Sequence, residues 1–231
     1  MSLNSDFCRF ILQVNQYIED QTEHKLWNTS ILPSDDTILE ELCRPVSPLI
    51  EEQILAFCSA FQDHLLATGV SADKISLCQM ALTARSSFEP DLITAKIQNM
   101  LGVLHRKQGE FDASITYHQL SKEMRHKLGD KKGVAASLNG LGNTYLSKGD
   151  YPMAKQCFEK SIVIKRELGD ERGVIGGQNN LGYLAQVQGD LEKAELIYSD
   201  ALQKARTLGY ERIIPLLNLG LREVAELKTA A

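Results

Sequence analysis

The sequence lacks paired cysteines, long apolar runs and an excess of positive charge. Its five cysteines form no Cys-x-x-Cys pair, which argues against a zinc knuckle or a disulfide framework. Its apolar stretches fall short of the roughly 20 residues that cross a bilayer, and no secretory signal opens the chain. With 25 basic and 30 acidic residues the net charge is −5, so no surface for nucleic-acid phosphates is expected. We therefore expect a cytoplasmic protein without nucleic-acid or membrane partners.

Motifs of catalysis and cofactor binding are also missing. The five histidines show no metal-ligand spacing, no nucleophile motif accompanies them, and no Gly-x-x-x-x-Gly-Lys-Ser/Thr phosphate loop is present. Gly176 and Gly177 lie within a helical pattern rather than after a strand, so they do not indicate nucleotide binding. The sequence thus predicts a protein that is not an enzyme and binds no cofactor or metal.

What the sequence does contain is a repeat of 40 residues. Two interleaved glycine series recur at this spacing, namely Gly109, Gly149, Gly189 and Gly129, Gly169, Gly209. Between these glycines lie apolar residues at helical spacing, so each unit is predicted to be a hairpin of two helices. Gly149 is predicted to end one helix, and Pro152 is predicted to lie in the first turn of the next. Asp130 and Asp170 follow the other glycines and are predicted N-caps.

The middle unit resembles the tetratricopeptide repeat family. Its pattern Leu138-x-x-Leu-Gly-x-x-Tyr145, followed by Ala154-x-x-x-Phe158, is similar to the family's signature. The first unit departs from this signature, with His118 at the place of Phe158. Units of this length look like those of cell-polarity adaptors, kinesin light chains, peptide-sensing bacterial regulators and the sensor ends of signalling ATPases.

The resemblance, which covers about residues 91–210, implies an all-α fold. The architecture that the resemblance implies is a right-handed superhelix, or α-solenoid, of tetratricopeptide-like hairpins. We predict an N-terminal helical extension, a divergent hairpin, three repeats and a C-terminal capping helix, with the ranges 1–48, 49–90, 91–130, 131–170, 171–210 and 211–231. Capping is the favoured role of the last helix, because its apolar stripe would cover the end of the array. The stripe consists of Ile213, Leu217, Leu221, Val224 and Leu227. A homodimer through the terminal helices is the alternative.

The concave groove, which the first helix of each hairpin lines in this family, is the candidate binding site. Asn99, Asn139 and Asn179 recur at the 40-residue spacing and are expected to form a ladder, with Asn143 one turn beyond Asn139. Asparagine is unfavourable inside helices, so its repeated use indicates a compensating gain. An amide can bind the backbone of an extended peptide, or it can instead bond between adjacent helices. Further residues expected to flank the groove are Lys96, Arg106, Gln178 and Tyr183.

We predict a protein-protein interaction module, a scaffold or adaptor, whose groove binds a peptide or helix of a partner protein. The family's clamp for chaperone C-terminal tails is not expected, because Ala136 and Gly176 align with Lys96. One alternative is a sensor or regulatory fragment of a larger signalling ATPase or transcription regulator, which the flanking gene sequence would reveal. Another is a structural homo-oligomer, which light scattering would reveal.

Overall fold

The computed structural model describes residues 75, 78–79, 82 and 92–230. The predicted N-terminal extension (1–48) lies outside the described residues. So does the predicted divergent hairpin (49–90), apart from the helical residues at 75, 78–79 and 82.

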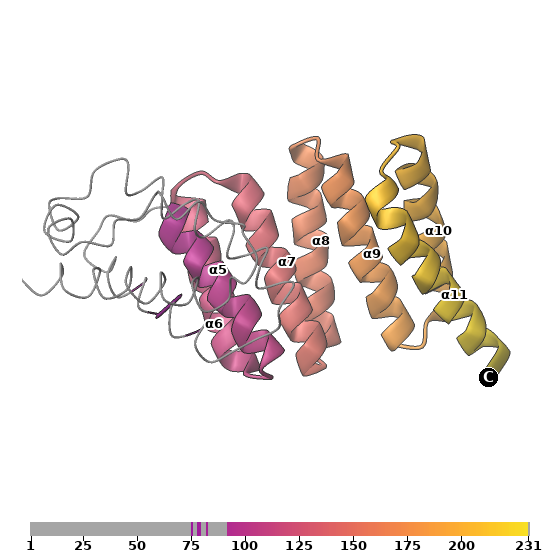
Figure 1. Cartoon of the computed structure of the whole chain (residues 1–231), viewed down its shortest axis with the longest axis horizontal. Helices are drawn as coiled ribbons and strands as arrows, with labels where there is room; N and C mark the ends of the chain where they lie inside the picture. The colour runs from indigo at the N-terminus through magenta and orange to yellow at the C-terminus, as the bar shows by residue number, and fades with distance from the viewer. Residues whose placement is uncertain (1–74, 76–77, 80–81, 83–91, 231) are drawn as a thin grey trace, which may run out of the picture.

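Residues 92–230 form seven α-helices and one short 3-10 helix, without a strand (Figure 1). These elements are α5 (Leu92–Lys107), α6 (Phe111–Lys127), α7 (Lys131–Lys148), α8 (Tyr151–Glu167), α9 (Glu171–Val187), α10 (Leu191–Thr207), η2 (Glu211–Ile213) and α11 (Ile214–Ala230). The all-α prediction is confirmed.

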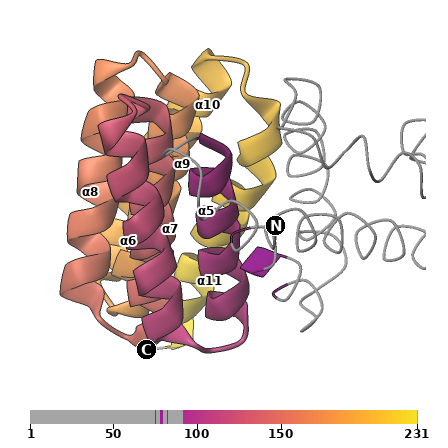
Figure 2. The ribbon, with the colours of Figure 1, turned by 90° about the vertical axis from the view of Figure 1, so that its left-hand side faces the viewer.

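The helices pair into hairpins that stack in chain order along one axis (Figure 1). Helix α5 packs on α6, α7 on α8 and α9 on α10, and each hairpin then packs on the next through α6 with α7 and α8 with α9. First helices also meet, α5 with α7 and α9 with α11. Viewed along the stack, α6 and α8 lie on one side and α5 and α11 on the other (Figure 2). The molecule is thus a superhelix of helical hairpins, as predicted.

Glycines in the left-handed conformation end the helices. Gly149, for example, has a φ of +84° and caps α7. The other glycines with positive φ are Gly109, Gly129, Gly169, Gly189 and Gly209. Because a side chain strains this backbone conformation, glycine at these six positions sets where each helix stops.

Aspartates begin the helices that follow these turns. Oδ1 of Asp130 accepts a hydrogen bond of 2.8 Å from the backbone N–H of Gly133, and Oδ1 of Asp170 accepts one of 2.9 Å from Gly173. Pro152 lies in the first turn of α8. The predicted caps and the predicted proline position are confirmed.

A large ring on each second helix packs against glycines of the first helices. A β-carbon added to Gly142 would lie 2.5 Å from the ring of Phe158, so only glycine permits this approach. His118 lies in the same way against Gly102 and Gly140. Tyr198 lies against Gly182 and Gly220. The Leu-Gly pairs of the sequence therefore mark where hairpins close around a ring.

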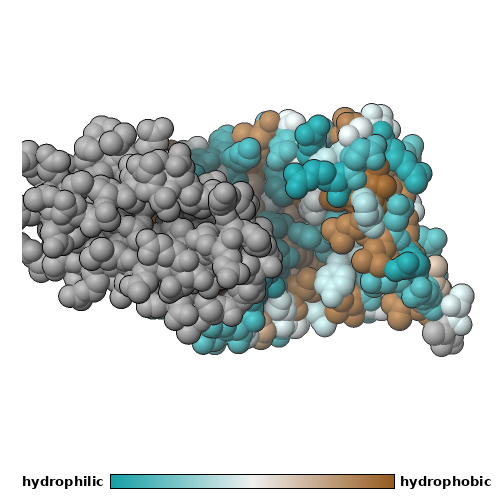
Figure 3. All heavy atoms as spheres, viewed as in Figure 1, coloured by the Kyte–Doolittle hydropathy of each residue, from teal (hydrophilic) through white to brown (hydrophobic). Residues whose placement is uncertain are grey.

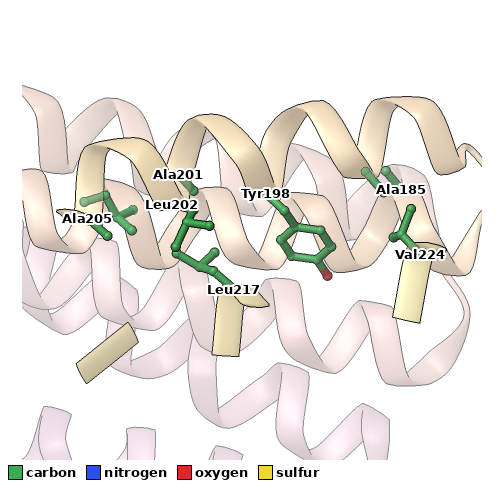
Figure 4. Close-up of a cluster of buried hydrophobic side chains, with 9 residues drawn as sticks. Ala185, Tyr198, Ala201, Leu202, Ala205, Leu217 and Val224 are labelled. Carbon is green, nitrogen blue, oxygen red and sulfur yellow. The ribbon is translucent and has the colours of Figure 1, made fainter. Parts of the chain in front are cut away.

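Helix α11 covers the last hairpin. Leu217 and Val224 are buried in a cluster with Tyr198 and Leu202 of α10 (Figure 4). Not all of the predicted apolar stripe is buried, however, because Leu227 is 45% exposed. Two neighbours of the buried residues, Leu216 and Leu219, are also exposed, by 51% and 39%. Helix α11 thus caps the array with one face and presents leucines on another.

Candidate binding groove

A pocket of about 450 Å³ lies between the first helices α7, α9 and α11. It is lined by amides, by two cationic side chains beside one aspartate, and by an apolar wall from the start of α11.

Asparagines of successive hairpins meet in this pocket. Asn139 of α7 and Asn179 of α9 both line it, together with Asn180. The Asn180 side chain donates a hydrogen bond of 2.8 Å to Oδ1 of Asn139, which joins α9 to α7. Among the described residues, no hydrogen bond occupies the side chain of Asn179. The expected alternative of bonding between adjacent helices therefore applies to Asn139, while the amide of Asn179 remains available at the pocket.

Two glycines of α9 form part of the pocket lining, Gly173 and Gly176. No atom of a neighbouring element lies within 4 Å of the point where a β-carbon of Gly176 would stand. Ala136 and Lys96 occupy the equivalent place in the two preceding units. The missing side chain at Gly176 keeps the surface open beside Asn179, so a ligand backbone can approach α9 there.

The cationic side chains are Lys165, near the end of α8, and Arg172, in the first turn of α9. Lys165 is half-buried, and this burial lowers the pKa of its ammonium group, an effect that the Asp170 carboxylate opposes. Within residues 92–230 Lys165 forms no ion pair. The guanidinium carbon of Arg172 lies 5.3 Å from the centre of the Tyr210 ring, a cation-π contact. Asp170 caps α9.

The apolar wall consists of Tyr210, Ile213 and Leu216. Leu216 stands at the repeat position of Gly176, and Leu219 at that of Asn179. The inner face thus changes from amides on α7 and α9 to leucines on α11. Figure 3 shows the hydrophobic surface that gathers over α11.

Other residues predicted for the groove do not line this pocket. Nδ1 of His118 lies 3.1 Å from Oδ1 of Asn99, so that amide is used within its own hairpin. The amide of Gln178 donates a hydrogen bond of 2.6 Å to Asp200 on α10. The ladder of three asparagines is therefore reduced at this pocket to its last two members.

The remaining predicted residues lie on the first helices away from the pocket. Lys96 of α5 and Tyr183 of α9 are exposed, and Asn143 of α7 is half-buried. Arg106 of α5 is half-buried, and desolvation lowers the pKa of its guanidinium.

The sequence did not predict a place in the groove for four of the lining residues, Lys165, Arg172, Asn180 and Tyr210. A signal for Lys165 exists, because Arg125, Asp130 and Gly133 recur 40 residues later as Lys165, Asp170 and Gly173. In the earlier unit the guanidinium of Arg125 is buried and lies 3.8 Å from the Asp130 carboxylate.

The described residues offer no group of three His, Cys, Asp or Glu that could hold a metal ion. No helix in the described part of the chain is long and apolar enough to cross a membrane.

Comparison with known proteins gives the following relationships. Residues 93–167 match the model of the tetratricopeptide repeat family. No curated protein matches the sequence. The structure is similar to that of BtubC (BKLC) from P. vanneervenii, with 17% identity, a TM-score of 0.62 and coverage of 98% of this chain and 84% of that one. It is also similar to aspartyl phosphate phosphatase F from Bacillus subtilis, with 11% identity, a TM-score of 0.71 and coverage of 99% and 70%. At these identities the likeness concerns the fold alone.

Proposed function

Because residues 93–167 match tetratricopeptide repeats, we propose that this chain binds a segment of a partner protein in the groove between α7, α9 and α11. It acts as a protein-protein interaction module, a scaffold or adaptor, rather than as an enzyme. Whether it is joined to a signalling ATPase or regulator is a separate question, which the flanking gene sequence answers.

The observation that carries this proposal is that amides of successive first helices converge on one open pocket. Asn179 offers two donors and an acceptor that no described residue uses, and Asn139 keeps the N–H donors of its amide. An extended peptide brings backbone N–H and C=O groups that need such partners when they leave water. The open surface at Gly176 admits that backbone beside Asn179.

The test uses peptides selected from a random displayed library against the full chain, then synthesised with a fluorescent label. We expect Asn139→Ala with Asn179→Ala to weaken binding about tenfold in fluorescence anisotropy, because roughly 1.4 kcal/mol of hydrogen bonding is lost. Asn218→Ala is the matched control, since Asn218 is exposed on α11 and does not line the pocket. Unchanged affinity in the double variant, with its helical circular dichroism intact, would exclude this groove.

A second candidate function, self-association, is favoured by the exposed leucines of α11. The buried Leu217 is unsuitable for testing it, because a change there would disrupt the core. Leu219→Glu with Leu227→Glu alters exposed positions outside the pocket. If α11 is a dimer interface, this variant sediments as a monomer where the original chain sediments as a dimer. A monomeric original chain at micromolar concentration would rule the interface out.

A further inference from the structure

Building on the proposed function, we propose that the bound segment carries an acidic residue and, two residues away, an apolar one. The acidic side chain lies between Lys165 and Arg172. The apolar side chain lies on the wall formed by Ile213 and Leu216.

The charge at this end of the pocket points to a carboxylate ligand. Although the whole chain has a net charge of −5, two cationic side chains line the pocket beside a single acidic one. That acidic residue, Asp170, already accepts a hydrogen bond from the backbone of Gly173. Within residues 92–230 its carboxylate forms no ion pair, although its charge acts on Lys165. A ligand carboxylate would therefore meet cationic groups that the protein itself leaves without ion pairs.

Lys165 gains most from such a ligand. Its ammonium group has lost part of its hydration through burial, and the charged form is disfavoured for that reason. An incoming carboxylate replaces the lost hydration with a charge-assisted hydrogen bond. In the preceding unit the same place belongs to Arg125, which already has Asp130 beside it. Asp170 acts on Lys165 from the corresponding place but forms no ion pair with it, so this position is ion-paired in one unit and not in the next.

The side chain of Arg172 is restrained at a position where it can bind the same carboxylate. Its guanidinium stacks on the ring of Tyr210, which restrains the long side chain through one face. A guanidinium that stacks through one face keeps the N–H donors at its edge, and these can bind both oxygens of a carboxylate. A restrained arginine loses less side-chain entropy when it binds.

The spacing of the two ligand residues follows from the helix. Arg172 and Gly176 lie one turn apart on α9, about 6 Å along the axis. Leu216 and Gly176 line the same pocket from α11 and α9 and share a repeat position, so we take Gly176 as the level of the apolar wall along α9. In an extended peptide, residues i and i+2 point to the same side and are separated by about 6.6 Å. The acidic and apolar residues are therefore expected at i and i+2, in either order.

The experiment uses the full chain and the random displayed peptide library described above. We expect the selected peptides to share Asp or Glu two residues from Leu, Ile, Val, Met or Phe. Replacing that acid by its amide should weaken binding at least about tenfold, and added salt should weaken the original peptide more than the amide version. The charge-neutral variant Lys165→Met with Arg172→Gln should lose the preference for acid over amide.

The matched control is Lys160→Met with Arg206→Gln. It removes the same kinds of charge from exposed positions that do not line the pocket, and it should retain the preference.

The outcomes separate the two proposals. The selected peptides could lack an acidic residue and still bind more weakly to the Asn139→Ala, Asn179→Ala variant. That result would overturn the acidic ligand and leave the proposed groove intact. A preference that survives in the charge-neutral variant would likewise overturn it. No selected peptide above background, or binding that no pocket variant weakens, would overturn the groove and the acidic ligand together.

Discussion

Nδ1 of His118 lies 3.1 Å from Oδ1 of Asn99, and this contact joins α6 to α5 inside their hairpin. The His118 ring is 0% exposed and lies between Gly102 and Gly140. Its Nε2 atom has no hydrogen-bond partner. Desolvation lowers the pKa of His118 to about 4, and the charges of Arg106 and Arg125 act in the same direction. The histidine is therefore neutral in the native protein at pH 7.

His118 should make the protein sensitive to mild acid. Its native pKa is about 4, below the unfolded value of 6.5, so between these values the unfolded chain binds more protons. The free energy of unfolding should fall as the pH drops from about 6.5 to about 4, by at most about 3 kcal/mol from this residue. Urea unfolding at pH 7 and pH 4.5 measures the loss. His118→Phe, which introduces the residue that Phe158 provides in the next unit, should show a smaller loss, and an equal loss would contradict this role.

Two adjacent glycines of α9 should respond oppositely to alanine. A β-carbon on Gly177 would lie 2.5 Å from Cγ1 of the buried Ile162, whereas one on Gly176 meets nothing within 4 Å. Gly177→Ala should lower the free energy of unfolding by about 1–3 kcal/mol through overpacking. Gly176→Ala should raise it by about 0.5–1 kcal/mol through helix propensity. Urea unfolding of both variants measures these changes. A change of the free energy of unfolding in the same direction in both would contradict the packing argument.

The cap of α7 should contribute measurably to stability. Asp130 accepts its hydrogen bond from Gly133, and its other oxygen lies 3.8 Å from the guanidinium of Arg125. Asp130→Ala should therefore cost about 1 kcal/mol or more in thermal unfolding. Asp130→Asn keeps an acceptor for Gly133 and should lose less. Equal losses in the two variants would assign the effect to the ion pair rather than to the cap.

Two buried serines that share a repeat position should contribute differently to the free energy of unfolding. The hydroxyl of Ser161 donates to the carbonyl of Ala135 at 2.8 Å, and that of Ser121 donates to Ala95 at 2.6 Å. Ser121 also lies 3.1 Å from the hydroxyl of Ser137, which is buried. Ser121→Ala should cost about 1–2 kcal/mol in urea unfolding, because Ser137 loses a partner.

Ser161→Ala is the matched comparison. It should cost less than Ser121→Ala, since the hydroxyl of Ser161 bonds only to the carbonyl of Ala135 and its removal leaves no buried hydroxyl without a partner. A larger cost at Ser161 would show that the bond between Ser121 and Ser137 contributes nothing.

The sequence predicts the hairpins because their signals are local. Positive φ at Gly149 and capping by Asp130 depend only on neighbouring residues, and both can be read from the repeat. The site depends instead on how hairpins meet. The hydrogen bond from Asn180 to Asn139 joins α9 to α7. No spacing within one helix reveals which of the two amides, Asn179 or Asn180, will bond to the preceding hairpin. The same applies to Arg172 and Tyr210, which approach each other only when α9 and η2 are in place.

The left-handed glycines recur every 20 residues, so excising one 40-residue unit would leave every remaining turn where it was. The buried side chains, however, would no longer fit together. Without residues 131–170, His118 would face Asn180 where it now rests on Gly140, and a side chain would occupy the space of its ring. Glycines at the turns allow any number of units, whereas glycines within the helices fix their order. Shortening this array by recombination should therefore yield an intact chain path with a damaged core.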